Sequence, residues 1–286
     1  MPRQRGQAEP ERDGRDAGST IALAALRAGA RTGAVLIISG VVLVGLWAGL
    51  LWLLNVSSFV GKRPWDVWKY LFNVPAAAAN RSLMLHDLAT TLGDASIGFV
   101  AGLVAATAVS AIFTLVRPIE YVFMPLAMLL RSVPLVAMAP VIGLVTGRGV
   151  AGAATISGIV VFFPVLVNVS LGLRSAPASS LDLIRVNGGG KWTALRKVGV
   201  PSALPSLFAS IRISVPGAVI GAMLYEWLFS AKGLGAEIFR AAADVNYDEV
   251  WTIVVMVTAS SIVIYSLVSV IESAVLAAWG PNAGRR

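Results

Sequence analysis

Six runs of apolar residues, separated by shorter polar or basic stretches, dominate the pattern of the chain. Each run approaches or exceeds the roughly 20 residues that a helix needs to cross a hydrocarbon core of about 30 Å. The pattern therefore predicts an all-α, polytopic membrane protein with six transmembrane helices. We expect them at about residues 33–54, 86–116, 121–145, 150–173, 203–229 and 250–279.

The third run is the most irregular, because Pro125, Pro134 and Pro140 interrupt it. Broken helices in transporters line cavities, where their freed backbone groups find partners. We expect this span, together with the Pro216-Gly217 region of the fifth span, to form walls of a translocation pathway. The side chains proposed for that pathway are Arg131, Ser132, Met138 and Glu226.

Ionisable residues inside membrane spans are costly and indicate function or a structural pair. Arg131 and Glu226 both fall near membrane depth, so they either form an ion pair or are separately solvated in a translocation cavity. Asp87, Asp94 and Glu272 lie nearer the ends of their spans, where we expect them to reach the interface.

Small residues recur four positions apart within three spans. The pairs are Gly98 and Gly102, Gly143 and Gly147, and Gly217 and Gly221. Small side chains let helix backbones approach closely in a membrane. We interpret these pairs as sites of tight helix packing.

Composition removes several classes of function. Only 13% of the residues are charged and 57% are hydrophobic, whereas a soluble protein carries about a quarter charged residues. The net charge of +8 resides in loops and tails, which fits the setting of membrane topology better than binding of nucleic acid. The chain has no cysteine and a single histidine, so we predict no metal site and no catalytic residues in this chain.

The basic residues also predict an orientation in the plasma membrane. With both termini in the cytoplasm, the inner segments carry 14 Lys and Arg residues and the outer segments 7. The predicted organisation is a disordered cytoplasmic tail (1–30), a first transmembrane helix with an outer loop (31–85), a core of five transmembrane helices (86–280) and a cytoplasmic tail (281–286). The first apolar run has full membrane length, so we interpret it as a retained anchor rather than a signal peptide.

The cytoplasmic segment 174–202, between the fourth and fifth spans, is the most informative stretch. Apolar spacing predicts a short helix from Leu181 to Val186, capped by Ser179 or Ser180, before glycines 188–190 break it. A second short helix, from Trp192 to Val198, should end before Pro201. Two such helices form a knob that a groove of another protein can hold, or an interfacial loop without a partner.

This segment resembles the coupling loop of importer-type ABC permeases. Their loop has Glu-Ala-Ala, three residues, Gly, nine residues and then Ile-x-Leu-Pro, and this chain keeps that spacing throughout. The residue types depart from the family pattern at 183 and 184. The matching residues are Asp182, Leu183, Ile184, Gly188, Val198, Val200 and Pro201.

Three further segments are similar to the nitrate/sulfonate/taurine-type branch of these inner-membrane permeases, and the resemblance covers about residues 87–279. They are Arg131-Ser-Val-Pro134 followed by Pro140, Phe162-Phe-Pro-Val-Leu-Val-Asn168 and Lys232-Gly-Leu-Gly235.

The resemblance implies a permease homodimer in the membrane. Each permease would rest on an ATP-binding subunit that carries ATP and magnesium, and would dock the coupling loop in a cleft of that subunit. A binding protein outside the cytoplasm would deliver a small solute, such as nitrate, a sulfonate, taurine or a vitamin precursor.

The chain itself lacks the signature of an ATPase. A phosphate-binding loop needs Ser or Thr after Gly-Lys, whereas Trp192 follows Gly190-Lys191. The other classes considered are an ion-coupled secondary transporter and a membrane enzyme. The first often shows inverted repeats and midplane carboxylates. The second needs clustered catalytic groups.

Overall fold

The computed structural model describes residues 38–279, except for the side chains of residues 277 and 278. The chain divides after Asp66 into two compact units, and each is described by itself. The sequence predictions for residues 1–37 and 280–286 lie outside the described residues.

The described part of the first unit begins with the apolar helix Ile38–Leu53. Nearly all of its large side chains are exposed, as expected for a helix surrounded by lipid. A compact turn follows, in which Gly61 lies against Val56 and Leu51. Asp66 accepts a hydrogen bond from the backbone N–H of Arg63 at 2.9 Å, which fixes the start of helix α2 (Pro64–Phe72).

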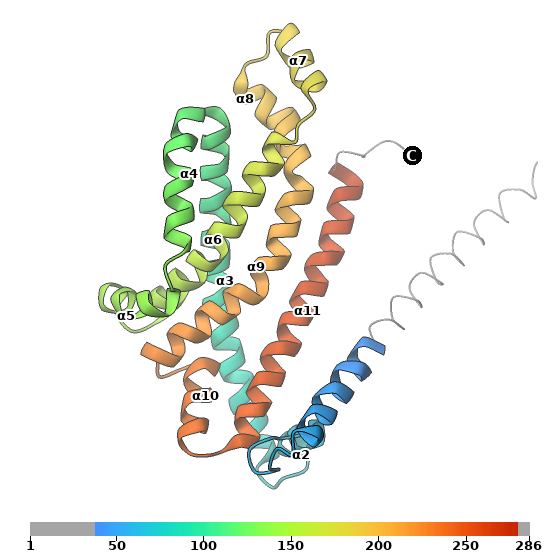
Figure 1. Cartoon of the computed structure of the whole chain (residues 1–286), viewed down its shortest axis with the longest axis vertical. Coiled ribbons are helices and arrows are strands. Elements are labelled where there is room, and N and C mark those ends of the chain that lie inside the picture. The colour runs from blue at the N-terminus through green and yellow to red at the C-terminus, as the bar shows by residue number, and fades with distance from the viewer. Residues whose placement is uncertain (1–37, 280–286) are drawn as a thin grey trace, which may run out of the picture. The chain divides into compact units, whose positions relative to one another are not determined.

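The second unit is a bundle of helices (Figure 1). Long helices α3, α6, α9 and α11 run through it, and α4 and α5 form a bent pair. Short helices α7 and α8 lie at one end and α10 lies at the other end. The bounds are α3 Ala77–Leu115, α4 Arg117–Arg131, α5 Leu135–Thr146, α6 Val150–Arg174, α7 Ala178–Val186, α8 Lys191–Ala194, α9 Val200–Phe229, α10 Leu234–Ala243 and α11 Tyr247–Trp279.

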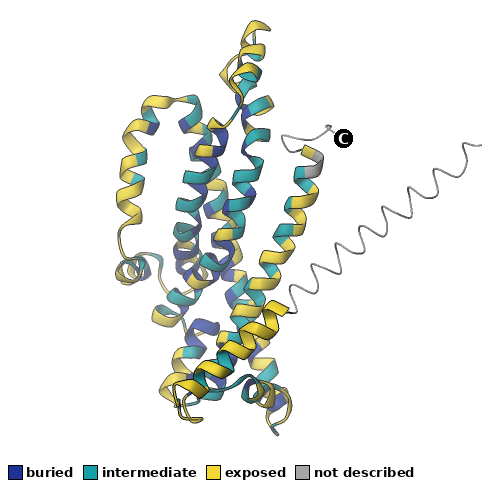
Figure 2. Ribbon diagram, turned by 45° about the vertical axis from the view of Figure 1, so that its right-hand side comes forward, coloured by how far each residue is buried: buried dark blue, intermediate teal, exposed yellow. Residues whose placement is uncertain are grey.

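The core of the bundle is the close packing of α6 against α3 on one side and α9 on the other (Figure 2). A Cβ atom on Gly102 would lie 2.5 Å from the carbonyl oxygen of Gly158, and one on Gly221 would lie 3.0 Å from the Cα of Ser157. The predicted tight packing is therefore confirmed for 98/102 and 217/221. In the third pair, Gly143 contacts the Phe229 ring, but Gly147 has no neighbour within 4 Å of a built Cβ.

Buried hydroxyl groups add hydrogen bonds across these contacts. Ser157 Oγ donates to the carbonyl of Ala218 at 2.9 Å, which joins α6 to α9. Ser110 Oγ lies 3.2 Å from the carbonyl of Leu166, which joins α3 to α6. In lipid, where apolar burial does not distinguish helix from acyl chain, such packing and hydrogen bonds hold helices together.

The third predicted span is a bent pair of helices. Helix α4 ends at Arg131, helix α5 begins after Pro134, and the axes differ by 100°. Proline disfavours helical geometry in the preceding residue, so Pro134 explains the break. Pro125 and Pro140 remain inside their helices, so the expectation that all three prolines interrupt the span is wrong.

Within residues 38–279, four helices are long and apolar enough to cross a membrane, and a fifth span results if the bent pair counts as one. The predicted all-α membrane fold is confirmed at this level. The described part of the first apolar run, Ile38–Leu53, is shorter than a full span, and six spans are not shown.

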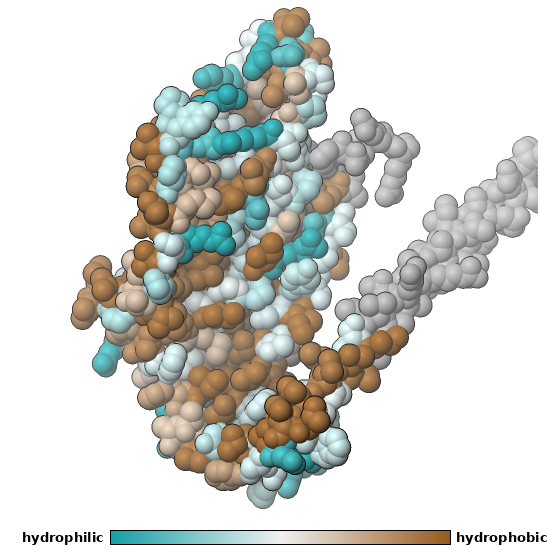
Figure 3. All heavy atoms as spheres, viewed as in Figure 1, coloured by the Kyte–Doolittle hydropathy of each residue, from teal (hydrophilic) through white to brown (hydrophobic). Residues whose placement is uncertain are grey.

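Helix α11 packs mainly on α9, and much of its surface is exposed. Glu272 pairs with Arg212 at 3.1 Å, and the Arg212 guanidinium lies 5.8 Å from the ring centroid of Tyr265. The glutamate therefore has a partner on a neighbouring helix rather than reaching the interface alone. Figure 3 shows hydrophobic side chains over the middle of one face and hydrophilic ones gathered mostly near α7 and α8.

The α3–α6 contact gives a stability prediction. Gly98→Ala should lower the free energy of unfolding by about 1–3 kcal/mol through overpacking, since the new Cβ would lie 2.5 Å from the Cβ of Ser157. Gly93→Ala, on the same helix with nothing within 4 Å, should leave it unchanged or raise it slightly. Thermal unfolding of the two detergent-purified variants would measure this, and equal melting temperatures would contradict the packing.

Candidate functional site

The loop between α6 and α9 is buried near α9, at Leu195 and Gly199, but helix α7 in its middle is not packed against the bundle. Helix α7 has no buried residue. It ends at Val186, after which Gly188 adopts a φ of +77° in the left-handed region that favours glycine. Helix α8 then begins, and a π-helical turn, Leu195–Gly199, leads into α9.

Three large apolar side chains in this loop are mostly exposed. Leu183, Val186 and Trp192 expose 63%, 86% and 64% of their surface. We call these three residues the apolar knob. Four basic residues of the same loop are also exposed: Arg185, Lys191, Arg196 and Lys197. Exposed large apolar side chains among polar residues mark an interaction site.

The sequence-predicted coupling residues divide into two groups. Ile184, Val198 and Pro201 are partly buried, and Ile184 packs over Gly189. The others are exposed, and Asp182 bonds Arg185 within α7 at 2.9 Å. The exposed group consists of Asp182, Leu183, Gly188 and Val200.

Two local predictions about this loop are wrong. Helix α7 begins after Pro177 with no side-chain cap, so neither Ser179 nor Ser180 is the N-cap. Pro201 does not end a helix but lies in the first turn of α9, directly after the π-helical turn Leu195–Gly199. The chain therefore continues as one helical rod from Lys191 to Phe229.

At the opposite end, helix α10 is clamped by side chains from α3 and α9. Thr91 Oγ1 accepts the N–H of Leu234 at 2.8 Å and donates to Glu226 Oε2 at 2.8 Å. Glu226 Oε2 also accepts the N–H of Gly235 at 2.9 Å, and Asp87 accepts the N–H of Gly233. Three amides at the start of α10 are thus satisfied by groups that suit the positive end of a helix dipole.

The clamp explains the Lys232-Gly-Leu-Gly235 segment. Gly233 has a φ of +89°, and a Cβ there would overlap the Glu226 carboxylate. A Cβ on Gly235 would overlap the carbonyl oxygen of Met223. Both glycines are therefore required for α10 to approach α9 this closely.

Other acidic groups gather around the clamp. Asp94, Glu237 and Glu249 are all at least nine-tenths buried. Glu237 pairs with Arg240, and Glu249 accepts a hydrogen bond from Asn246 at 2.7 Å. Tyr70, outside the spans, also bonds Glu249, and burial, followed by the charge of Glu249, raises the pKa of its phenol.

The hypothesis of an Arg131–Glu226 ion pair is wrong. Glu226 is fully buried and bonds Thr91 and Gly235, while Arg131 is exposed at the end of α4. Asp87 and Asp94 are also buried. Helix α3 begins at Ala77, well before the predicted span, so both residues lie within the helix rather than near its start. The sequence analysis did not predict that Thr91 would bond Glu226 and the start of α10. The only sequence signal for this close contact was the pair of glycines at 233 and 235.

A cavity of about 490 Å³ lies between the bent pair and the α3–α6 contact. Met138 is in its wall, whereas Arg131 and Ser132 are exposed at the bend. Phe162 and Phe163 meet edge to face at 5.4 Å on another part of the wall. The remaining lining residues are Ala101, Gly102, Ala105, Leu130, Ala154, Thr155, Gly158 and Ile159.

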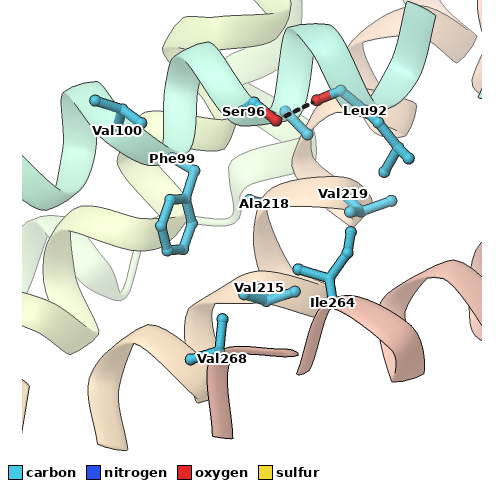
Figure 4. Close-up of a pocket in the computed structure, with 10 residues that line it drawn as sticks. Leu92, Ser96, Phe99, Val100, Val215, Ala218, Val219, Ile264 and Val268 are labelled. Carbon is cyan, nitrogen blue, oxygen red and sulfur yellow. Dashed lines mark hydrogen bonds between the residues drawn. The ribbon is translucent and has the colours of Figure 1, made fainter. Parts of the chain in front are cut away.

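A second cavity, of about 180 Å³, lies between α3, α9 and α11 (Figure 4). Its lining is apolar except for Ser96, whose hydroxyl donates to the carbonyl of Leu92 at 2.6 Å. Because no free polar group faces this space, we interpret it as a packing gap beside α11.

The clamp gives a second prediction. Glu226→Gln should weaken the capping of α10, because a charge-assisted hydrogen bond contributes about 1.5–3 kcal/mol. Amide hydrogen exchange in residues 234–243 should become faster while exchange in α6 is unchanged. Asp244→Asn, which removes an exposed carboxylate just after α10, is the control. Equal protection of α10 in both variants would contradict the clamp.

Comparison with known proteins identifies the family. The profile of the family "binding-protein-dependent transport system inner membrane component" matches residues 98–277. The chain is 28% identical over 230 residues to a probable ABC transporter permease protein of Haemophilus influenzae, covering 80% of this chain and 91% of that protein.

Two further relatives have named solutes. The formylaminopyrimidine transport permease protein ThiX of Halalkalibacterium halodurans is 33% identical over 54% of this chain and 62% of its own length. The putative aliphatic sulfonates transport permease protein SsuC of Bacillus subtilis is 28% identical over 55% and 57%. Because the family profile matches more than half of its residues, this chain belongs to the family of inner membrane components of binding-protein-dependent transport systems.

Proposed function

We propose that this chain is the membrane-spanning permease subunit of an ATP-driven importer of the ABC type. The observation that carries the proposal is the apolar knob, Leu183, Val186 and Trp192, presented on a loop whose ends join two long membrane helices. The spacing of residues from Asp182 to Pro201 in this loop matches the coupling loop of the family. An exposed knob of this kind fits a cleft in a second protein.

The motor is a separate ATP-binding subunit, present as a dimer, which holds ATP and magnesium. The exposed basic residues of the loop favour a cleft with an acidic rim. The permease pairs with a second copy of itself, and an extracytoplasmic binding protein delivers the solute. The six-span topology, with α7, α8 and both termini in the cytoplasm, belongs to this proposal and rests on the Lys and Arg distribution.

Transport proceeds by alternating access. ATP binding closes the motor dimer, the knob moves with it, and the helices joined to the loop turn the permease outward; hydrolysis resets them. Such switching is a rigid-body motion between two packings. The bent pair and its 490 Å³ cavity are the proposed pathway wall, with Arg131, Ser132 and Met138 beside it.

Glu226 has a different role in this mechanism. Its carboxylate is used in the clamp on α10, so we propose that it holds the outer end of the pathway rather than contacting solute. Five of the six buried carboxylates of the described residues belong to the clamp or its surroundings, and the sixth, Glu120, pairs with Arg174, which does not favour an ion-coupled secondary transporter.

The solute belongs to the range of small molecules that the relatives' names cover, including a pyrimidine, riboflavin, sulfonates and nitrate. Delivery by a binding protein means that selectivity resides mainly in that protein.

Co-purification tests the proposal directly. Trp192→Asp places a charge in the knob and should release the ATP-binding subunit during purification, because burying an unpaired charge is strongly unfavourable. Trp65→Asp, at an exposed position in the first turn of α2, controls for loss of a surface tryptophan. Retention of the ATP-binding subunit by the Trp192 variant would contradict the docking role.

A second prediction concerns the break between α7 and α8. Gly188→Val should uncouple ATP hydrolysis from uptake while the chain still inserts, because a β-branched residue is strained at a φ of +77° and must re-aim α7. Gly190→Ala is the control, since that residue has ordinary extended geometry and open space around it. The measurement is solute uptake per ATP hydrolysed in proteoliposomes. An unchanged ratio in the valine variant would count against the coupling role.

A further inference from the structure

Displacement of α7 can reach the bundle through only a few contacts. The helix itself buries no side chain, so its own packing transmits little. Its two chain connections lead to the end of α6, at Arg174, and to the rod that continues as α9. Helix α5 borders the 490 Å³ cavity and contacts α6 and α9 elsewhere in the bundle, but neither connection leads along the chain to the first turn of α4.

An ion pair joins the end of α6 to the first turn of α4. Arg174, the last residue of α6, pairs with Glu120 in the first turn of α4. The Glu120 side chain is only 8% exposed, whereas that of Arg174 is 55% exposed. A nearly buried carboxylate depends on its cation, so the position of α4 is tied to the position of Arg174.

The rest of α4 is loosely held at this end. It packs mainly on α3, through partly buried residues such as Ile119 and Met124. Its opposite surface is open, with Tyr121 exposing 76% and Val122 60% of its area. A helix with so little surrounding packing can tilt when a single strong contact at its end moves.

Helix α4 also leads directly to the cavity. Leu130, one turn before the bend, and Met138, in α5, both line it. Tilting α4 about its contact with α3 therefore changes the cavity wall, with the 100° bend as the joint.

We infer that Glu120 and Arg174 are positioning residues that transmit movement of the coupling loop to the bent pair α4–α5, and so link ATP use to the opening of the solute cavity. This inference rests on the proposed function. It assigns a role in transport to two residues outside the loop motif.

Exchange of charges tests the pair in the complete complex, reconstituted with its ATP-binding subunit and binding protein. Glu120→Gln should reduce uptake about tenfold at a nearly unchanged rate of ATP hydrolysis, a typical size for one coupling contact. Glu120→Arg alone should abolish uptake, and the double variant Glu120→Arg/Arg174→Glu should recover most of it. Arg117→Gln, an exposed change in the same turn of α4, should leave uptake per ATP unchanged.

A distance measurement separates transmission from mere stability. The chain has no cysteine, so spin labels can be placed at Tyr121→Cys on α4 and at Leu171→Cys on α6, which are both exposed. In the otherwise unchanged chain, the distance between the labels should stay constant when a non-hydrolysable ATP analogue binds, because the pair moves the helices together. In the Glu120→Gln background it should change on nucleotide binding.

The outcomes distinguish this inference from the proposed function. Normal uptake per ATP in the Glu120→Gln variant, or no rescue by the double exchange in a folded complex, would overturn the role of the pair while leaving the importer intact. Absence of ATP-dependent uptake by the unchanged chain would overturn the proposed function itself.

Discussion

The close approach of α3, α6 and α9 is the constraint on which the other features of the second unit depend. In a bilayer, apolar side chains gain little by leaving lipid for protein, so helices are held by contact between backbones and by hydrogen bonds. Gly102 against Gly158 and Gly221 against Ser157 allow that contact, and Ser157 adds a bond to Ala218. The three helices form a rigid frame, and the loop, the bent pair and α10 are attached to it.

The two ends of this frame use polar groups in opposite ways. At the end with α10, carboxylates are buried, and Glu226 Oε2 bonds Thr91 and Gly235. At the end with α7, the loop exposes both apolar and basic side chains. The α10 end is held together by hydrogen bonds within the chain, whereas the α7 end exposes side chains that a partner could cover. This difference suits a protein that opens to solute at one end and binds a second subunit at the other.

Sequence pattern predicted the parts of the fold that depend on hydrophobic length. The fourth span was expected at 150–173, and α6 is Val150–Arg174; the fifth was expected to end at 229, where α9 ends. The pattern failed where tertiary contacts decide. Helix α3 begins well before its apolar stretch because Asn80 and Arg81 donate to carbonyls of α2 and Met84 packs against Leu234 of α10. The bend at Pro134 could not be separated from Pro125 and Pro140 by sequence alone.

The candidate site shows the same division. The spacing from Asp182 to Pro201 identified the loop, since it reflects a local alternation of helix and break. The partner of Glu226 could not be found that way, because its carboxylate bonds amides whose position depends on how α10 folds back. Likewise the pairing of Glu120 with Arg174 joins residues from different helices, and neither position carries a local signal.

The location of α7 on the cytoplasmic side, in contact with an ATP-binding subunit, is the central claim. It can be tested with a single cysteine at Val186, the most exposed residue of the knob, in a chain that has no other cysteine. A membrane-impermeant maleimide should leave Val186→Cys unlabelled in intact cells. It should label this cysteine in inside-out vesicles only after the ATP-binding subunit has been stripped. Labelling from the outside of intact cells, or equal labelling with and without that subunit, would contradict the account.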